Sequence, residues 1–226
     1  MNPADQPPRF AIVTGAARGL GREFCMRLAG ERYHVALADI DLAGVDETRR
    51  LVEQAGGTAR VEPCDVTQFD QWLALRDRLR ADWPRLDLLV NNAGMYASGF
   101  IGTLDLAEAE RLIRLNLMSV LYGCHAMVPW LAESATGSQP PLPKTHVINV
   151  ASSFAFLCPP GMAPYNLSKA GVVALSETLF GELRAKGVGV TVVCPGPMPT
   201  RFVEAASFET DEFRRLTESY VGQSKL

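Results

Sequence analysis

Short runs of apolar residues alternate with longer helical patterns along most of the chain. The apolar runs cover residues 10–14, 34–38, 59–63, 86–90, 146–150 and 190–194, and several of them are nearly unbroken. An unbroken apolar run is typical of a strand that is buried on both faces of a parallel sheet. The alternation therefore predicts an α/β fold, a doubly wound parallel sheet with helices on both faces.

The helical stretches are recognised by the spacing of their apolar residues. Three of them cover residues 20–28, 104–131 and 167–183. Thr67 and Asp70 have the spacing of a capping box, so a further helix is expected to begin there. Residues 133–144 are rich in Ser, Gly and Pro, which predicts a surface loop within the domain.

Composition narrows the class of protein. A length of 226 residues suits one domain, residues 1–226, and 22 Lys and Arg against 25 Asp and Glu give a net charge of −3, which does not indicate a nucleic-acid partner. No apolar run is long enough for a membrane span, and residues 1–10 lack a signal-peptide pattern, so we expect a cytoplasmic protein. Five cysteines without a C-x-x-C pair and three isolated histidines argue against a disulfide framework or a metal site.

A glycine-rich loop follows the first expected strand directly. Residues 14–21 read T-G-A-A-R-G-L-G and lead into the helix that begins near Leu20. Gly15 permits a tight turn, while Gly19 and Gly21 let backbone amides approach a pyrophosphate at the start of the helix. Since the loop lies between a strand and a helix, it indicates a dinucleotide site in a Rossmann-type fold.

The end of the second expected strand bears on the choice of cofactor. Asp39 follows Gly21 by 18 residues, near the usual interval for a carboxylate that binds the ribose hydroxyls of NAD. Asp39 could instead cap a helix, although Asp41 could fill that role. Arg18 could pair with the 2′-phosphate of NADP. We favour NAD, because Asp39 would contact the discriminating group directly.

Ser152, Tyr165 and Lys169 carry the candidate chemistry. Tyr165 and Lys169 are four residues apart, so they share one face of a helix. A nearby ammonium could bring a phenol, whose pKa is normally about 10, towards neutrality. Ser152 could then orient the oxygen of an alcohol or a carbonyl. Taken alone, the pair could also be an ordinary surface pair.

Further motifs complete a recognisable order: C-D-V at 64–66, N-N-A-G at 91–94, Asn116 in the long helix, and P-G-x-x-x-T at 195–200. With the motifs above, the chain resembles the short-chain dehydrogenase/reductase family, in its compact single-domain branch, from about residue 10 to residue 200. The three residues between Gly15 and Gly19 match that branch and not the extended branch of sugar-nucleotide epimerases.

The resemblance implies a role for each catalytic position. Tyr165 would be the general acid/base, and Lys169 would lower its pKa and hold the nicotinamide ribose. Ser152 would bind the substrate oxygen, and Asn116 would hold a water that links Lys169 to solvent. Asn116 could also be an ordinary polar helix residue. Ser153 is the less suitable hydroxyl, because Ser152 has the family's interval of 13 residues to Tyr165.

The resemblance also implies a set of cofactor contacts. Asp65 would contact the adenine and Val66 would contribute its backbone. Asn92, Ala93 and Gly94 would line the cleft, although Asn92 could merely brace the sheet. Around the nicotinamide, the family implies Pro195, Gly196 and Thr200.

The end of the chain departs from the family pattern. A helix and a seventh strand usually follow P-G-x-x-x-T, whereas the sequence after Thr200 is charged and helical in pattern. We expect either missing sequence or a six-stranded sheet with an open edge. Residues 197–226 would form a substrate lid. Its aromatics either anchor its helices or form an apolar pocket, whose candidates are Phe202, Val203, Phe208 and Phe213 with Met95, Phe154 and Met162.

The sequence thus predicts an NAD-dependent oxidoreductase that interconverts a medium-sized, hydrophobic secondary alcohol and a ketone. One alternative is an NADP-dependent ketoreductase, such as a 3-oxoacyl carrier-protein reductase, and another is a non-catalytic nucleotide-binding scaffold. Residues 112–131 are apolar on more than one face. The resemblance implies that this helix and the Tyr165 helix build a homodimer or homotetramer.

Overall fold

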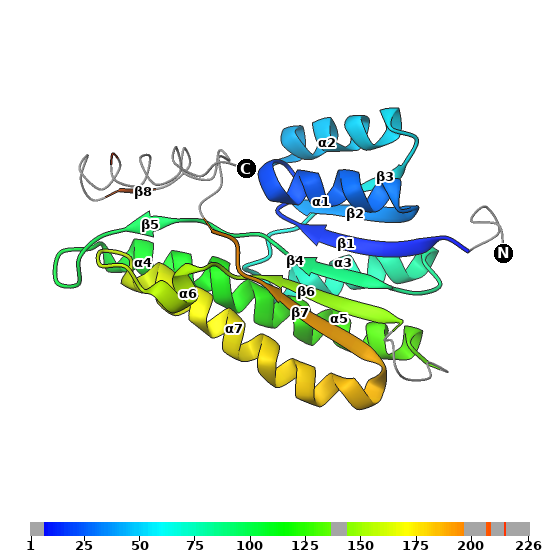
Figure 1. Ribbon diagram of the computed structural model, residues 1–226. Helices are drawn as coiled ribbons and strands as arrows, with labels where there is room; N and C mark the ends of the chain where they lie inside the picture. The colour runs from blue at the N-terminus through cyan, green and yellow to red at the C-terminus, as the bar shows by residue number, and fades with distance from the viewer. Residues whose placement is uncertain (1–6, 137–143, 197–206, 209–214, 216–226) are drawn as a thin grey trace.

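The computed structural model describes residues 7–136, 144–196, 207–208 and 215. Six strands form the main sheet: β1 (Arg9–Thr14), β2 (Tyr33–Asp39), β3 (Thr58–Pro63), β4 (Leu88–Asn91), β6 (Thr145–Val150) and β7 (Val188–Val193). Their order is β3-β2-β1-β4-β6-β7, and all neighbouring pairs are parallel (Figure 1). All six predicted strands are confirmed, with ends shifted by two residues at most.

Helices cover both faces of this sheet. On one face lie α1 (Gly19–Gly30) and α2 (Leu42–Gln54), and on the other lie α3 (Phe69–Asp82), α5 (Ser119–Ser134) and α7 (Ala163–Leu183) (Figure 1). Two separate hydrophobic cores result: Ile12 of β1 belongs to the core under α3, α5 and α7, while its neighbour Val13 belongs to the core under α1 and α2. The doubly wound fold is therefore confirmed.

The long apolar helix is interrupted by a wider turn. It consists of α4 (Leu106–Ile113), a π-helical turn η2 (Arg114–Met118) and α5. By length and composition alone, Leu106–Ser134 could cross a membrane, and 50% of its most apolar window is buried inside the molecule; one such helix is weak evidence for a membrane span. Asn116 lies in the π turn with a fully buried side chain. π turns are rare and often occur at functional sites, and the apolar spacing did not predict this one.

Two predictions about local structure have different outcomes. The capping box is wrong: α3 begins after Gln68 without a side-chain cap, and the Thr67 hydroxyl donates to Asp65 Oδ1 (2.7 Å). The role suggested for Asp41 is confirmed, because its carboxylate accepts from the Gly44 amide (3.0 Å) and caps α2.

Several short elements were not predicted. They are β5 (Ala97–Ser98), which pairs with β8 (Ser207–Phe208), α6 (Phe154–Leu157) and the 3₁₀ turn η3 (Arg184–Lys186). Among the described residues, β7 pairs with β6 alone. The expected 133–144 loop is helical at its start, and residues 137–143 lie outside the described part, as do Thr200 and most of the expected lid.

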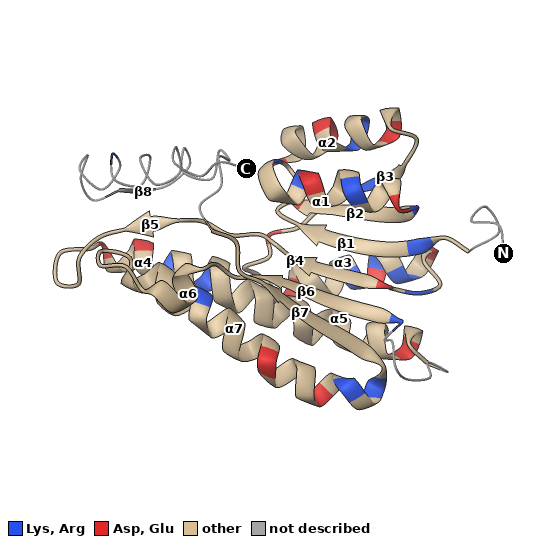
Figure 2. Cartoon of the chain, in the orientation of Figure 1, with Lys and Arg blue, Asp and Glu red and all other residues tan. Residues whose placement is uncertain are grey.

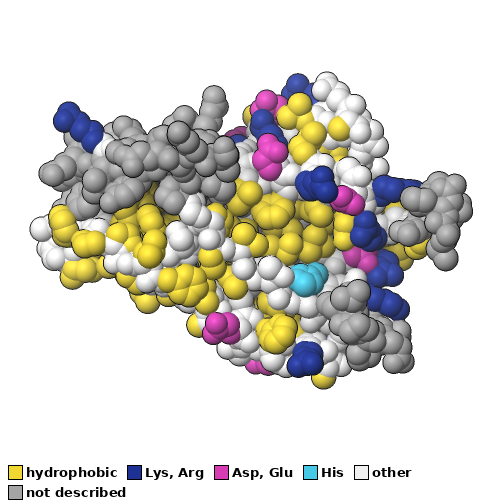
Figure 3. Space-filling view, in the orientation of Figure 1, with side chains coloured by type: hydrophobic (Ala, Val, Ile, Leu, Met, Phe, Trp, Pro, Cys, Tyr) yellow, Lys and Arg dark blue, Asp and Glu magenta, His cyan; other side chains and the backbone are white. Residues whose placement is uncertain are grey.

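The surface carries both charges and apolar groups. Acidic and basic residues alternate along the outer helices (Figure 2), and apolar side chains gather on the viewed face (Figure 3). Large exposed apolar side chains occur near α4, α6 and the start of α7: Phe100, Ile101, Leu106, Phe156, Leu157 and Leu167.

Candidate functional site

The candidate site lies where the order of the strands reverses. β1 has β2 on one side and β4 on the other, so the loops after β1 and β4 begin at the same end of the sheet. These loops touch: a Cβ atom added to Gly15 would lie 2.9 Å from the Cα of Ala93. Ligands of open α/β sheets bind at such a reversal, beyond the carboxyl ends of the strands.

The glycine-rich loop needs its glycines for shape. Gly15 and Gly19 have φ angles of +66° and +54°, which other residues rarely adopt. A Cβ on Gly21 would lie 1.9 Å from the Gly15 carbonyl oxygen, so any side chain there would push the loop away from α1. Arg18 is exposed and precedes α1 in extended conformation, and Leu20 is half-buried in the first turn of α1. Since these glycines have no side chains, space remains beside the first-turn amides of α1. A pyrophosphate fits this space and could accept hydrogen bonds from those amides.

Asp39 is tied to this loop. Its Oδ2 accepts from the Ala17 amide (3.0 Å), and its Oδ1 accepts from the amides of Ile40 (2.8 Å) and Asp41 (3.0 Å). A carboxylate can accept about four hydrogen bonds, so capacity remains for a ribose hydroxyl. Asp39 thus combines the position expected of a ribose ligand with a structural contact that the sequence did not reveal.

Asn92 joins the loops after β1 and β4. Its side-chain amide donates to the carbonyls of Thr14 (2.9 Å) and Gly15 (3.3 Å). The backbone amides of Asn92 and Ala93 donate to the Thr14 hydroxyl (2.9 and 3.1 Å). The bracing role considered for Asn92 is therefore present, and buried Thr14 is a member of the site that the sequence did not single out.

Asp65 and Val66 follow β3 at the edge of the cleft. The Asp65 carboxylate accepts from the Thr67 amide (2.9 Å), while the Asp65 amide donates to Gln71 Oε1 (2.7 Å). Val66 is buried, and its carbonyl accepts from the indole of Trp72 (3.0 Å). These bonds fix the loop that would border an adenine.

Ser152, Tyr165 and Lys169 are brought together by β6 and α7. Ser152 follows the end of β6, and Tyr165 and Lys169 lie one turn apart on α7. The Ser152 side chain lies close enough to the Tyr165 hydroxyl to favour the phenolate by hydrogen bonding. The Lys169 Nζ lies 5.8 Å from the centre of the Tyr165 ring and donates to the Val150 carbonyl (3.0 Å). The alternative of an ordinary surface pair is wrong, because Tyr165 and Lys169 are 6% and 3% exposed.

Asn116 completes this group from the π turn. Its Oδ1 accepts from the Met95 amide (2.7 Å), and its Nδ2 donates to the Met95 carbonyl (2.9 Å) and to Ser168 Oγ (3.3 Å). A Cβ on Gly94 would lie 3.1 Å from Asn116 Oδ1 and 3.6 Å from Lys169 Nζ. Gly94 therefore separates the asparagine from the lysine, and Asn116 is not an ordinary helix-surface residue.

Burial governs the electrostatics of this group. It raises the pKa of Tyr165 to about 12, although the hydrogen bond with Ser152 acts in the opposite direction. It also lowers the pKa of Lys169 to about 8. The expectation that Lys169 lowers the tyrosine pKa is not met by the protein alone, because the loss of solvation outweighs other effects on the phenol.

The segment that follows β7 contributes Pro195 and Gly196. The Pro195 carbonyl accepts from the Ser153 amide (2.9 Å), which holds this segment beside Ser152. Cys194 lies at the same place: its thiol accepts from the Ser152 amide and feels the charge of Lys169, while burial raises its pKa. Cys194 is only partly buried, whereas Cys25, Cys64 and Cys124 are buried.

An apolar and aromatic cluster surrounds the tyrosine. Tyr96 and Phe154 meet the Tyr165 ring edge-on, at centroid distances of 5.3 and 6.3 Å. Met95 and Met162 belong to the same cluster. The three pocket candidates outside the lid are therefore near Tyr165, Tyr96 is an addition, and no side chain of the four lid candidates is described.

The sequence did not reveal the residues that hold the loops of the site by hydrogen bonds with backbone groups. Arg22, Thr48 and Thr14 hold the loops of the cleft, yet each is a polar residue in an ordinary helix or strand pattern. Tyr96 gave a weak signal, since it directly follows Met95 and the N-N-A-G motif. Within the described ranges, no group of three His, Cys, Asp or Glu side chains is arranged to bind a metal.

Comparison with known proteins supports the resemblance. The family described as short chain dehydrogenase matches residues 9–210. A curated relative, the probable oxidoreductase EphD of Mycobacterium bovis, is 34% identical over 203 residues, which cover 88% of this chain and 33% of the relative. The chain thus spans about a third of the length of that relative.

Solved structures agree. A short-chain dehydrogenase/reductase from Burkholderia phymatum, in complex with NAD, has a TM-score of 0.88 and 29% identity, over 97% of this chain and 81% of that one. A metagenomic short-chain oxidoreductase in complex with NADP has a TM-score of 0.76 and 31% identity, over 83% of this chain and 82% of that one. Similar structures therefore hold either nicotinamide cofactor.

Proposed function

Because this chain belongs to the short-chain dehydrogenase/reductase family, we propose that it is an NAD-dependent oxidoreductase that interconverts a secondary alcohol and a ketone. The observation that carries the proposal is the convergence of Ser152, Tyr165, Lys169 and Asn116 at the end of the sheet that holds the glycine-rich loop. At this end of the sheet, a bound redox cofactor and the acid/base groups would act on the same substrate.

Each side chain has a proposed task. Tyr165 gives its proton to the carbonyl oxygen during reduction and takes it back during oxidation, while Ser152 orients that oxygen. With a pKa of about 12, Tyr165 is protonated at neutral pH and is ready as the acid for reduction. Lys169 holds the ribose and passes the proton onward, and Asn116 holds a water that links Lys169 to solvent. When bound, the nicotinamide accepts or supplies the hydride, and its oxidised ring adds a positive charge that favours a phenolate.

Asp39 supports NAD as the preferred cofactor. Its carboxylate lies beside the loop, where a 2′-phosphate would meet a negative charge. The competing proposal, an NADP-dependent ketoreductase, is supported by exposed Arg18, which could pair with that phosphate. The two proposals differ in one measurable ratio, kcat/KM for NADH against kcat/KM for NADPH.

The aromatic cluster supports a hydrophobic substrate. Tyr96, Phe154 and Met162 belong to one cluster with Tyr165 and offer apolar contact beside its ring. Such walls favour a medium-sized alcohol or ketone with apolar groups on both sides of the reacting carbon. A charged or strongly hydrated substrate would lose its hydration there without replacement.

A spectrophotometric screen tests the proposal. The full chain is mixed with NADH or NADPH and a panel of aliphatic, alicyclic and aromatic ketones, and in reverse with the matching alcohols and the oxidised cofactors. We expect NADH-linked reduction of hydrophobic ketones with a higher kcat/KM than for NADPH. Preference for NADPH would favour the ketoreductase, and tight NADH binding with no turnover of any panel member would favour a non-catalytic scaffold.

We also propose that the protein forms a homodimer or homotetramer through α5 and α7. Leu121, Leu167 and Phe180 are large apolar residues on these helices, with exposures of 41%, 60% and 55%. Apolar surface of this kind is commonly covered by a partner. Light scattering during gel filtration measures the mass directly, and a monomer would refute this part of the proposal.

A cytoplasmic location is proposed as well. The five cysteines are all free thiols in the structure, which fits a reducing compartment. Fractionation of cells that express the tagged full chain tests the location, and recovery in a membrane or secreted fraction would contradict it.

A further inference from the structure

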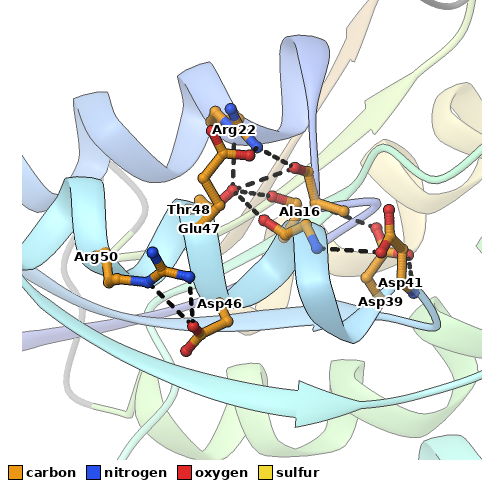
Figure 4. A network of polar contacts seen from close by, with 10 residues as sticks. Ala16, Arg22, Asp39, Asp41, Asp46, Glu47, Thr48 and Arg50 are labelled. Atoms are coloured by element: carbon orange, nitrogen blue, oxygen red, sulfur yellow. Dashed lines mark hydrogen bonds and ion pairs between the residues drawn. The ribbon is translucent and has the colours of Figure 1, made fainter.

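One peptide unit of the glycine-rich loop is held at both ends. The Ala16 carbonyl accepts from the Thr48 hydroxyl (3.0 Å), and the Ala17 amide donates to Asp39 Oδ2 (3.0 Å) (Figure 4). A trans peptide unit is planar, so fixing its oxygen and its N–H sets the orientation of the whole unit. The loop is therefore fixed by side chains from β2 and α2, which come later in the chain.

The next peptide unit is held by its carbonyl. Ala17 O accepts from Arg22 Nη2 (2.7 Å) and lies 3.3 Å from the Thr48 hydroxyl. Since the carbonyl and the N–H of one unit point in opposite directions, the Arg18 amide is turned away from Arg22 and Thr48. The contacts leave that amide directed to the other side of the loop, next to the first-turn amides of α1.

Arg22 and Thr48 also support each other. Arg22 Nε donates to Thr48 Oγ1 (3.0 Å), and Arg22 Nη2 forms an ion pair with Glu47 (2.7 Å) (Figure 4). Thr48 is fully buried, and its single hydroxyl proton is directed to the Ala16 carbonyl or to the Gly44 carbonyl of its own helix (3.1 Å).

We propose that Thr48 and Arg22 are positioning residues for the cofactor, which act by fixing the amides of the glycine-rich loop in the orientation that receives a pyrophosphate. The inference rests on the proposed function, since it assigns the phosphates of the dinucleotide to this loop. Thr48 and Arg22 touch neither the hydride nor the proton being transferred. Their loss weakens cofactor binding and leaves the chemical step unchanged at saturating cofactor.

Thr48→Val is the most direct variant, because valine keeps the shape of threonine and removes only the hydroxyl. We expect the Kd for NADH to rise about 10-fold, since one buried carbonyl loses its donor and Arg22 loses an acceptor. We expect kcat at saturating NADH to stay within about 2-fold of wild type. Thr48→Ser keeps the hydroxyl and should restore most of the affinity, and Arg22→Met should weaken binding in the same way.

The chain offers matched controls. Thr145 is also a buried threonine whose hydroxyl donates to a backbone carbonyl, that of Leu131 (3.1 Å), but it lies at the opposite end of the sheet. Arg49 lies on α2 in ion pairs with Asp46 and Glu53, and it makes no contact with the loop in the described structure. Thr145→Val and Arg49→Met should therefore leave the Kd for NADH unchanged.

Hydrogen exchange and NADH titration are measured on the same full-length variants. In the ligand-free protein, Thr48→Val should speed amide exchange in residues 14–22 several-fold, while Thr145→Val leaves this segment unchanged. The inference is overturned if Thr48→Val changes neither exchange nor Kd, or if Thr145→Val changes both equally. Wild type that binds neither NADH nor NADPH overturns the proposed function and this inference with it, whereas normal binding by wild type and Thr48→Val alike overturns the inference alone.

Discussion

The two sides of the candidate site are built in different ways. Around β1, β2 and α1, polar side chains such as Asp39 and Thr48 are paired with backbone amides and carbonyls. Around β6, α7 and the π turn, Tyr165 and Lys169 are buried, and burial shifts the pKa of each away from its usual value. In the proposed function, the first side, the cofactor side, binds the dinucleotide, and the second, the reaction side, exchanges a proton.

The buried charge on the reaction side lowers the stability of the fold. A pKa of about 8 against an ordinary 10.5 means that the charged form of Lys169 destabilises the fold by about 3 kcal/mol at neutral pH. Tyr165 has no such cost at neutral pH, because burial favours the protonated phenol that is present there. Substitutions on the two sides should therefore affect different measurements.

Apart from Tyr165→Phe, Lys169→Met should have the largest effect of the substitutions that follow. Loss of the ammonium removes the charge beside Tyr165, and we expect kcat to fall about 100- to 1,000-fold. The variant should also be more stable than wild type, because a buried charge is replaced by an apolar group. Steady-state kinetics and urea unfolding measure both changes. Exposed Lys186→Met is the control, and a Lys169→Met variant that is nearly fully active would place the lysine outside the reaction.

Gly21→Ala tests the cofactor side. The new Cβ would lie 1.9 Å from the Gly15 carbonyl oxygen, so the loop must move away from α1. We expect the Kd for NADH to rise about 100-fold, in the upper range for an overpacked site. Gly30→Ala is the matched control at the end of the same helix, where no atom lies within 4 Å of the added Cβ. Equal affinities of both variants would contradict the proposed role of the loop.

Asp39→Ala should have a smaller effect than Gly21→Ala, and the effect should be on the preference for NADH over NADPH. Removal of the carboxylate should shift the ratio of kcat/KM values about 30-fold towards NADPH, since a charged hydrogen-bond acceptor and a repulsion are lost together. Both absolute values should fall, because the Ala17 amide loses its partner. Asp41→Ala removes the cap of α2 and should leave the ratio unchanged. An unchanged ratio in Asp39→Ala would mean that Asp39 only braces the loop.

The smallest effect concerns stability and pH. Between the folded pKa of Lys169, about 8, and its ordinary value of 10.5, the unfolded chain binds more protons than the folded one. The destabilisation caused by Lys169 therefore decreases as the pH rises. The excess free energy of unfolding of Lys169→Met over wild type should shrink by about 1 kcal/mol from about pH 7.5 to about pH 9. The raised pKa of Tyr165 acts in the opposite direction only above about pH 10. Urea unfolding of both proteins checks this, and parallel pH profiles would contradict the burial of a charged lysine.

The comparison explains what the sequence could and could not predict. The six strands could be predicted from the apolar runs, because a strand that is buried on both faces of a sheet is apolar at nearly every position. Tyr165, Lys169 and Ser152 were found because their chemistry is carried by side chains at a fixed spacing. The π turn at Asn116 and the bonds of Thr48 and Arg22 were not found, because they depend on where the backbone of distant segments comes to lie. The raised pKa of Tyr165 in the protein alone was not predicted for a similar reason, since burial is a property of the fold.

Tyr165→Phe tests the central claim most directly, because it removes one oxygen atom and keeps the ring between Tyr96 and Phe154. Turnover of the best substrate and the Kd for NADH are measured on the same preparation, with Tyr122→Phe of α5 as the control. We expect kcat to fall at least about 1,000-fold and the Kd to stay within about 2-fold of wild type. A Tyr165→Phe variant that turns over at a rate near that of wild type would contradict the account.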